Sequence, residues 1–222
     1  MSTALWLTLQ TSALAVMLIV LPCVLLAYVL ARYQFHGKGI VSGLVGMPLV
    51  MPPTAVGYLL LRFLADDGWL GSGGVDLDLD ILLTWRATVV ACAVMATPLL
   101  VRTARVAFEG VDPRLEAMAH TLGISRTRTF FRFTLPLAFR GLAAAVILAF
   151  TRAIGEFGAT ITIAGNIPGK TQTLSTAIFT AQQVGNDAEA YALLGVSLTV
   201  GFLAILSSEW LVQQRPAPRR RS

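Results

Sequence analysis

Residues 5–31 read LWLTLQTSALAVMLIVLPCVLLAYVLA and contain no charged side chain. A helix needs about 20 mainly apolar residues to cross a bilayer, so this stretch is long enough for one span. It lacks a basic leading segment and is too long for a cleaved signal peptide. Of the whole chain, 55% is hydrophobic and only 13% is charged, against about 25% charged residues in soluble domains. The sequence therefore predicts an all-α integral membrane protein embedded in a lipid bilayer.

Four more apolar stretches follow, at residues 40–61, 81–101, 135–157 and 190–211. The first of these contains Pro48, Pro52 and Pro53, and we expect the prolines to kink or break that helix. Residues 158–183 are only weakly apolar, and we interpret them as an extracytoplasmic loop or re-entrant segment with a short helix near 173–181. We therefore predict a single transmembrane domain over residues 1–222, built as a five-helix bundle, with six spans as the alternative.

Basic side chains collect on one side of the predicted membrane. Most of the 17 lysines and arginines fall within residues 32–38, 102–140 and 215–221. The opposite side carries the acidic residues Asp66, Asp67, Asp76, Asp78, Asp80, Asp187 and Glu189. Because cytoplasmic loops are enriched in Lys and Arg, the chain is predicted to lie in the cytoplasmic membrane with its N-terminus outside and its C-terminus in the cytoplasm. The excess of basic residues is then explained by the orientation of the chain in the membrane, and we expect no nucleic-acid partner.

Residues 102–134 form the only long cytoplasmic segment between spans. Asp112 followed by Pro113 is a good helix start, since an aspartate caps a helix and proline fits its first position. Gly123 suits a left-handed helix end. Apolar residues recur at i, i+3, i+4 and i+7, namely Leu115, Met118, Ala119 and Leu122. This pattern predicts a short amphipathic helix that either lies on lipid headgroups or docks on a cytoplasmic partner, where small residues such as Ala117 allow close approach.

This segment resembles the conserved loop of binding-protein-dependent ABC importer permeases, which reads Glu-Ala-Ala, three residues, Gly, nine residues, Ile-x-Leu-Pro. Here Gly123 is followed after nine residues by Phe133-Thr134-Leu135-Pro136. The Glu-Ala-Ala positions read Ala117-Met118-Ala119 with Glu116 one place early, which weakens the case for a specific ion-pair role of that glutamate. The resemblance implies that residues 113–122 are the coupling helix, which sits in a groove of a separate ATPase subunit.

Three stretches are similar to molybdate permeases in particular: 46–60 (GMPLVMPPTAVGYLL), 109–123 (EGVDPRLEAMAHTLG) and 152–179 (RAIGEFGATITIAGNIPGKTQTLSTAIF). Within the last stretch, residues 155–158 and 166–169 favour molybdate or tungstate over sulfate. The resemblance implies a type I importer fold, working as a homodimer with two cytoplasmic ATPase subunits and an extracytoplasmic molybdate-binding protein. Tungstate and sulfate are the alternative cargoes.

Arg152 and Glu156 lie four residues apart near the outer end of the fourth predicted span. They can neutralise one another as an i,i+4 pair, which lowers the cost of charge in a membrane. Alternatively, Arg152 or the backbone near Gly155 and Gly158 borders the path of an oxyanion, where binding must be weak for passage.

Residues 164–171, AGNIPGKT, fall one residue short of a Walker phosphate loop, because Ala164 stands where glycine is needed. A membrane helix precedes them and they are predicted to lie outside the cell. We therefore expect no enzyme activity, cofactor or metal site in this chain, with ATP bound by the partner. An ion-coupled secondary transporter is the alternative from another class, and it predicts midplane carboxylates and internal repeats. Glu156 is the only acid well inside a predicted span.

Overall fold

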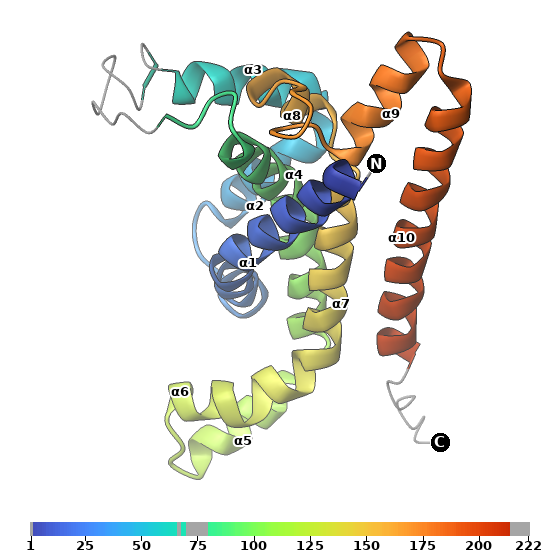
Figure 1. Cartoon of the computed structure of the whole chain (residues 1–222). Coiled ribbons are helices and arrows are strands. Elements are labelled where there is room, and N and C mark those ends of the chain that lie inside the picture. Colours follow the sequence, from blue (N-terminus) through green and yellow to red (C-terminus); the bar gives the residue numbers. More distant parts are fainter. Residues whose placement is uncertain (1, 66–67, 70–79, 214–222) are drawn as a thin grey trace.

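The structure is a computed structural model that describes residues 2–65, 68–69 and 80–213, all of whose regular secondary structure is helical (Figure 1). Within these residues, four helical segments are long and apolar enough to cross a membrane. They are α1 (Ser2–Arg32), α4 (Trp85–Glu109), the run from α6 (Arg126–Thr129) into α7 (Leu135–Ile154), and α10 (Asp187–Gln213). The bent pair α2 (Lys38–Val50) and α3 (Pro53–Leu64) supplies a fifth candidate. The prediction of an all-α membrane chain is confirmed. Asp66, Asp67, Asp76, Asp78 and the arginines at 215–221 lie outside the described residues.

The predicted break in the second span is sharp. Helices α2 and α3 meet at an angle of 112°. Met51 and Pro52 are extended there, and Pro53 begins α3, because proline suits the first turn of a helix but not its interior. Figure 1 shows α3 lying across the end of the bundle beside α8 (Gly158–Ile163), rather than continuing along α2.

The core is formed where α1, α4 and α7 pack together. Many of its fully buried positions are alanines, including Ala15, Ala27, Ala96, Ala138 and Ala145. Small residues let helices approach closely, and close packing is a main source of helix association in a membrane. The core therefore holds together the helices that lead to both ends of the bundle.

Helix α4 continues to Glu109, beyond the predicted span end at residue 101. Its last turns bury Ala104, Ala107 and Phe108 against the core, while Arg105 pairs with Glu109 on the outer face at 2.7 Å. An amphipathic end of this kind can stay helical outside the hydrocarbon, so the helix is longer than the apolar stretch that predicted the span.

Residues 158–183 form two short helices instead of a span. Helix α8 has 6 residues, and α9 (Leu174–Gln183) has 10. Thr173 caps α9 through a reciprocal pair of hydrogen bonds with Thr176, which agrees with the short helix expected near 173–181. Both helices are too short to cross a bilayer, so within the described residues they do not add a sixth span.

Candidate functional site

Helices α5 (Pro113–Thr121) and α6 form a hairpin at the end of the bundle opposite to α3 and α8 (Figure 1). The Asp112 carboxylate accepts a hydrogen bond from the backbone N–H of Arg114 at 2.9 Å, and Pro113 occupies the first turn. At the other end Gly123 adopts φ +78°, which lets the N–H of Ile124 reach the carbonyl of Ala119 at 3.0 Å. The local signals therefore place this helix as predicted.

The predicted apolar face of α5 is divided in the structure. Ala119 is buried, whereas the other three residues form an exposed surface, the docking face, made by Leu115, Met118 and Leu122. Their exposed fractions are 43%, 61% and 78%. Ala117 is also exposed. A cluster of exposed apolar side chains on a polar hairpin is typical of surfaces that contact a partner or a membrane.

Glu116 forms an ion pair, although its position one residue early in the motif weakened the case for one. Its Oε1 atom lies 2.9 Å from Nε of Arg32 and accepts a hydrogen bond from the Thr134 hydroxyl at 2.8 Å. Arg32 also donates to the carbonyl of Val111 at 2.9 Å. One carboxylate thus joins α5 to the last turn of α1 and to the single π-helical turn η1 (Phe130–Thr134) that precedes α7. Sequence reasoning could not identify this partner, because Arg32 lies 84 residues away in the chain.

Aromatic packing strengthens the same junction. The Tyr28 ring meets Phe108 and Phe130 edge-on, with centroids 5.4 Å and 4.7 Å apart. Such pairs contribute about 0.5–1.5 kcal/mol each beyond their burial. The hairpin is therefore attached to α1 and α4 as well as to α7, and Pro136 lies in the first turn of α7 next to this attachment.

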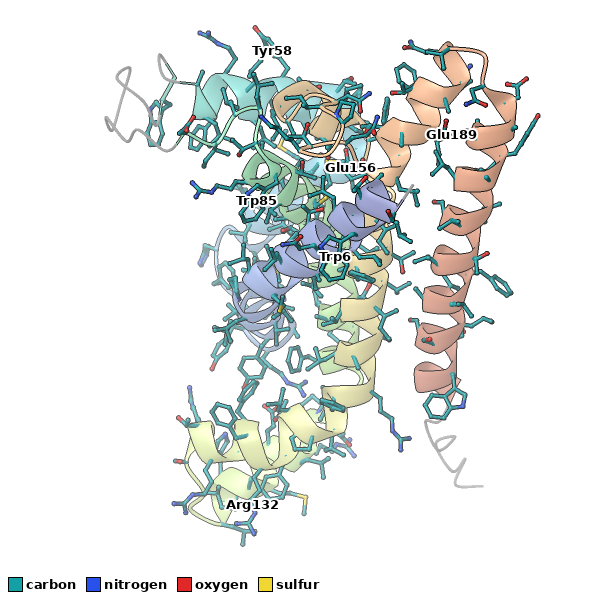
Figure 2. The ribbon with its side chains drawn as sticks, viewed as in Figure 1. Trp6, Tyr58, Trp85, Arg132, Glu156 and Glu189 are labelled. Carbon is teal, nitrogen blue, oxygen red and sulfur yellow. The ribbon has the colours of Figure 1, made fainter. Side chains whose placement is uncertain are left out.

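Arg152 lies in the last turn of α7, about 24 Å from Pro136 at 1.5 Å per helical residue, and Glu156 lies just beyond that end of the helix. Figure 2 shows Glu156 at that end and Arg132 with the α5–α6 hairpin at the opposite end. Helix α7 ends at Ile154, so Glu156 follows it and does not lie in its last turn as the i,i+4 prediction assumed. The two side chains nevertheless form an ion pair at 2.8 Å.

The Glu156 carboxylate has a second function in the local structure. Its side chain is 1% exposed, and Oε1 accepts a hydrogen bond from the backbone N–H of Ala159 at 2.9 Å. It therefore satisfies a free N–H group in the first turn of α8. The Arg152 side chain is 26% exposed, so it is partly accessible, whereas the acid that it pairs with is buried.

Two glycines allow α8 to touch α3. A Cβ atom on Gly158 would lie 2.7 Å from Cβ of Pro53, and one on Gly57 would lie 2.9 Å from Cα of Ala159. Both distances are shorter than side chains tolerate. Gly155 has no such restriction, because its nearest neighbours would be 3.9 Å away. Sequence reasoning singled out Gly158 and Gly155 together and missed Gly57, although Gly57 lies in the 46–60 stretch that resembles the permeases.

Sequence reasoning counted Arg102 among the basic residues of the cytoplasmic segment and predicted no contact for it. The structure puts it inside α4, with Nη2 only 2.7 Å from the position of a Cβ atom on Gly46. Gly46 is the one residue that the structure shows as buried in the described helix α2. A glycine inside an apolar helix was the only sequence signal for this contact.

Proteins with similar sequences are membrane transport permeases. The chain is 42% identical over 212 residues to the molybdenum transport system permease protein ModB of Escherichia coli strain K12, covering 95% of this chain and 93% of that protein. It is 36% identical over 183 residues to the sulfate transport system permease protein CysT of the same strain, covering 82% and 66% respectively.

Solved transporters share the fold at lower identity. A structure of the MetNI methionine ABC transporter in an inward-facing conformation matches with a TM-score of 0.69 and 16% identity, over 95% of this chain and 93% of that chain. A family match extends over residues 23–215, which includes the broken span, the hairpin and the Arg152 region. The chain belongs to the family of binding-protein-dependent transport system inner membrane components.

Proposed function

We propose that this chain is the permease subunit through which an ATP-driven importer moves molybdate across the cytoplasmic membrane. The observation that carries the cargo is the 42% identity to ModB of Escherichia coli over 95% of the chain. The sulfate permease CysT is less similar and matches a smaller part of the chain, so sulfate is the second candidate. Tungstate is a tetrahedral dianion like molybdate and is expected to compete with it.

The α5 helix is the element that would couple transport to ATP hydrolysis. Its docking face is apolar and exposed, as expected of a helix that fills a groove on a partner. Because Glu116 joins α5 to Arg32 and Thr134, a displacement of α5 would move the inner ends of α1 and α7 together. Closure of the ATPase dimer can then switch the bundle between inward-open and outward-open forms.

The assembly needs further subunits, since family membership implies a cytoplasmic ATPase and an extracytoplasmic binding protein. We place α5 and the C-terminus in the cytoplasm and the N-terminus outside, because the α5–α6 hairpin carries Arg114, Arg126 and Arg128. Two copies of the chain would enclose the path. A largely exposed apolar surface on α10, including Leu198 and Phe202, is available for lipid or for the second copy.

Arg152 is the residue that we assign to the path, with Gly155, Glu156 and Gly158 around it. Its partly exposed side chain can attract an oxyanion, while the adjacent Glu156 carboxylate offsets its charge and keeps the binding weak. A stably assembled Arg152→Gln transporter is therefore expected to import the anion more slowly while its ATPase docking is unchanged. Uptake at the wild-type rate would remove Arg152 from the path.

Reconstitution of the chain with its ATPase and binding protein in liposomes tests the function. We expect uptake of radiolabelled molybdate to require ATP, to be inhibited by unlabelled tungstate, and to resist an equal concentration of sulfate. Vesicles without ATP but with an imposed proton or sodium gradient are the control. Uptake driven by the gradient alone would contradict the proposal in favour of a secondary transporter. Stronger competition by sulfate than by tungstate would indicate that the chain belongs to an ATP-driven importer whose cargo is sulfate.

A further inference from the structure

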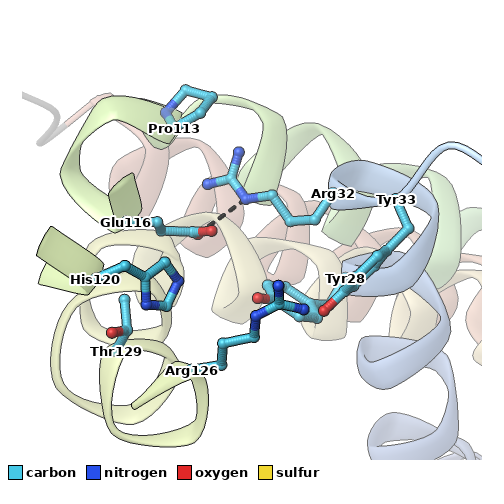
Figure 3. A pocket seen from close by; sticks show the side chains of 8 residues that line it. All are labelled: Tyr28, Arg32, Tyr33, Pro113, Glu116, His120, Arg126 and Thr129. Atoms are coloured by element: carbon cyan, nitrogen blue, oxygen red, sulfur yellow. Dashed lines mark hydrogen bonds and ion pairs between the residues drawn. The ribbon is translucent and has the colours of Figure 1, made fainter. Parts of the chain in front are cut away.

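A cavity of about 240 Å³ lies behind α5, between that helix and the inner end of α1 (Figure 3). Its polar lining includes Arg32, Arg126, Tyr28, Tyr33, His120 and Thr129. At about 30 Å³ per water molecule, the cavity has room for about eight waters. That space is sufficient for a tetrahedral oxyanion with part of its hydration shell.

The cavity and the docking face lie on opposite sides of α5. Pro113, Glu116 and His120 line the cavity at i, i+3 and i+7, so they share one face of the helix. The docking face has the same i, i+3 and i+7 spacing, but each of its residues comes two positions later in the sequence. Two residues correspond to a rotation of about 200° around a helix of 3.6 residues per turn, so the two faces point in nearly opposite directions. A partner bound to the docking face would leave the cavity accessible from its other side.

The charge of the cavity is positive. Arg32 is paired with Glu116, the single carboxylate in the lining. Arg126 has no acidic partner within residues 2–65, 68–69 and 80–213, and Figure 3 shows its side chain extending from α6 toward Tyr28 and Tyr33. A guanidinium group beside two phenolic hydroxyls presents several hydrogen-bond donors to the same space.

Thr129 adds an independent observation. Its residue is 2% exposed, and its hydroxyl oxygen has no hydrogen-bond partner in the described part of the chain. Buried polar groups in folded proteins are nearly always paired with protein, water or ligand, because an unpaired one costs free energy. The Thr129 hydroxyl oxygen is itself fully buried, so a group in the cavity can accept its hydrogen bond once the side chain rotates toward the cavity that the residue lines.

We infer that this cavity binds a tetrahedral oxyanion group on the cytoplasmic side, with Arg126 as its principal donor and Thr129 as a second donor after rotation of its side chain. The group belongs either to a free ion, such as phosphate or molybdate, or to the headgroup of an anionic lipid, since both offer the same oxygens. Charge-assisted hydrogen bonds from guanidinium to such oxygens are short and strong. A bound group would connect α6 to the end of α1 and so resist movement of α5 against α1.

The free-ion source is tested with the complete transporter in nanodiscs of phosphatidylcholine, titrated with radiolabelled inorganic phosphate or molybdate. Loss of a charge-assisted donor is expected to weaken one site per chain about tenfold in Arg126→Gln. Arg128→Gln is the matched control, because Arg128 lies on the same short helix, is exposed and does not line the cavity. The anion affinity of the Arg128→Gln transporter is expected to stay within about twofold of the wild type. Anion binding to the ATPase subunits is the same in every variant, so it does not affect the comparison.

Thr129→Val separates binding from folding. Valine has nearly the shape of threonine and removes a hydroxyl that lacks a partner, so the thermal stability without anion should be unchanged or higher. Anion affinity should nevertheless fall by about threefold with the loss of one neutral hydrogen bond. A variant that is less stable without anion, or that binds as tightly as the wild type, would contradict the role of Thr129.

The lipid source is tested by native mass spectrometry of complexes prepared in phosphatidylglycerol. A headgroup occupant predicts retained anionic lipid that is lost in Arg126→Gln and kept in Arg128→Gln. If neither free oxyanion nor anionic lipid binding depends on Arg126, the inference is refuted. The readout is binding and does not involve transport, so this failure is distinguishable from a failure of the molybdate uptake experiment.

Discussion

Replacing Glu116 by glutamine tests whether α5 is rigidly connected to the bundle. Glutamine keeps the shape of the side chain and can still accept the Thr134 hydrogen bond, but it removes the charge that Arg32 faces. The Arg32 side chain is only 9% exposed, so water from the adjacent cavity replaces the lost carboxylate only in part. Removing one partner of a buried ion pair costs about 3–5 kcal/mol, and we expect about 3 kcal/mol because Glu116 is itself partly exposed.

A double-mutant cycle distinguishes the ion pair from other effects of the substitution. In Arg32→Gln with Glu116→Gln no charge is left unpaired, so the two changes together should cost about 2 kcal/mol less than their sum. The pair Arg105 and Glu109 provides the control, since it has a similar distance of 2.7 Å but is 31% and 43% exposed. Neutralising it should change stability by about 0.5 kcal/mol.

Unfolding of the purified complex can be followed with a thiol-reactive dye, because both cysteines, Cys23 and Cys92, are free and buried. Transport is measured in parallel as molybdate imported per ATP hydrolysed. We expect Glu116→Gln to lower both the unfolding midpoint and this ratio, while the ATPase still binds through the intact docking face. An unchanged midpoint together with an unchanged ratio would refute the connection, as would simple additivity in the double variant.

Substitutions in three further regions probe the remaining contacts. Gly158→Ala should force α8 away from α3 at a cost of about 1–3 kcal/mol, whereas Gly155→Ala should be nearly neutral, as measured by the unfolding midpoint of each variant. Met118→Asp should weaken binding of the ATPase at least about tenfold in a pull-down titration without lowering thermal stability, because the side chain is exposed and burying a charge in the groove is costly. Arg152→Ala should destabilise the outer end by leaving Glu156 as a buried unpaired charge, and Arg152→Lys should restore the midpoint; equal midpoints for the two variants would contradict the ion pair's role in stability.

The two ends of α7 show how one helix can serve both coupling and transport. Pro136 marks the inner end, close to Glu116, and Arg152 marks the outer end. Helices transmit displacement along their axis because their backbone hydrogen bonds are internal. In the proposed mechanism, a movement imposed on α5 by a partner would therefore be carried along α7 toward Arg152, and it would need no continuous chain of polar contacts through the core.

Much of the fold follows from local properties of the sequence. Long apolar stretches have no alternative to forming helices in a membrane, since every backbone group must be satisfied internally. Asp112, Pro113 and Gly123 act on the backbone within a few residues of themselves, so their capping and termination were predictable. The prolines near residue 52 act equally locally, which explains why the break in the second span was also predicted.

The tertiary structure decided which residues meet across the chain. The pairing of Glu116 with Arg32, the close approach at Gly57 and Gly158, and the contact of Arg102 with Gly46 all join separate helices. Hydrophobic periodicity specifies which face of a helix is buried, but it contains no information on which helix covers that face or at what height. Partners far apart in sequence are selected by the packing of the whole bundle, so only the three-dimensional arrangement identifies them.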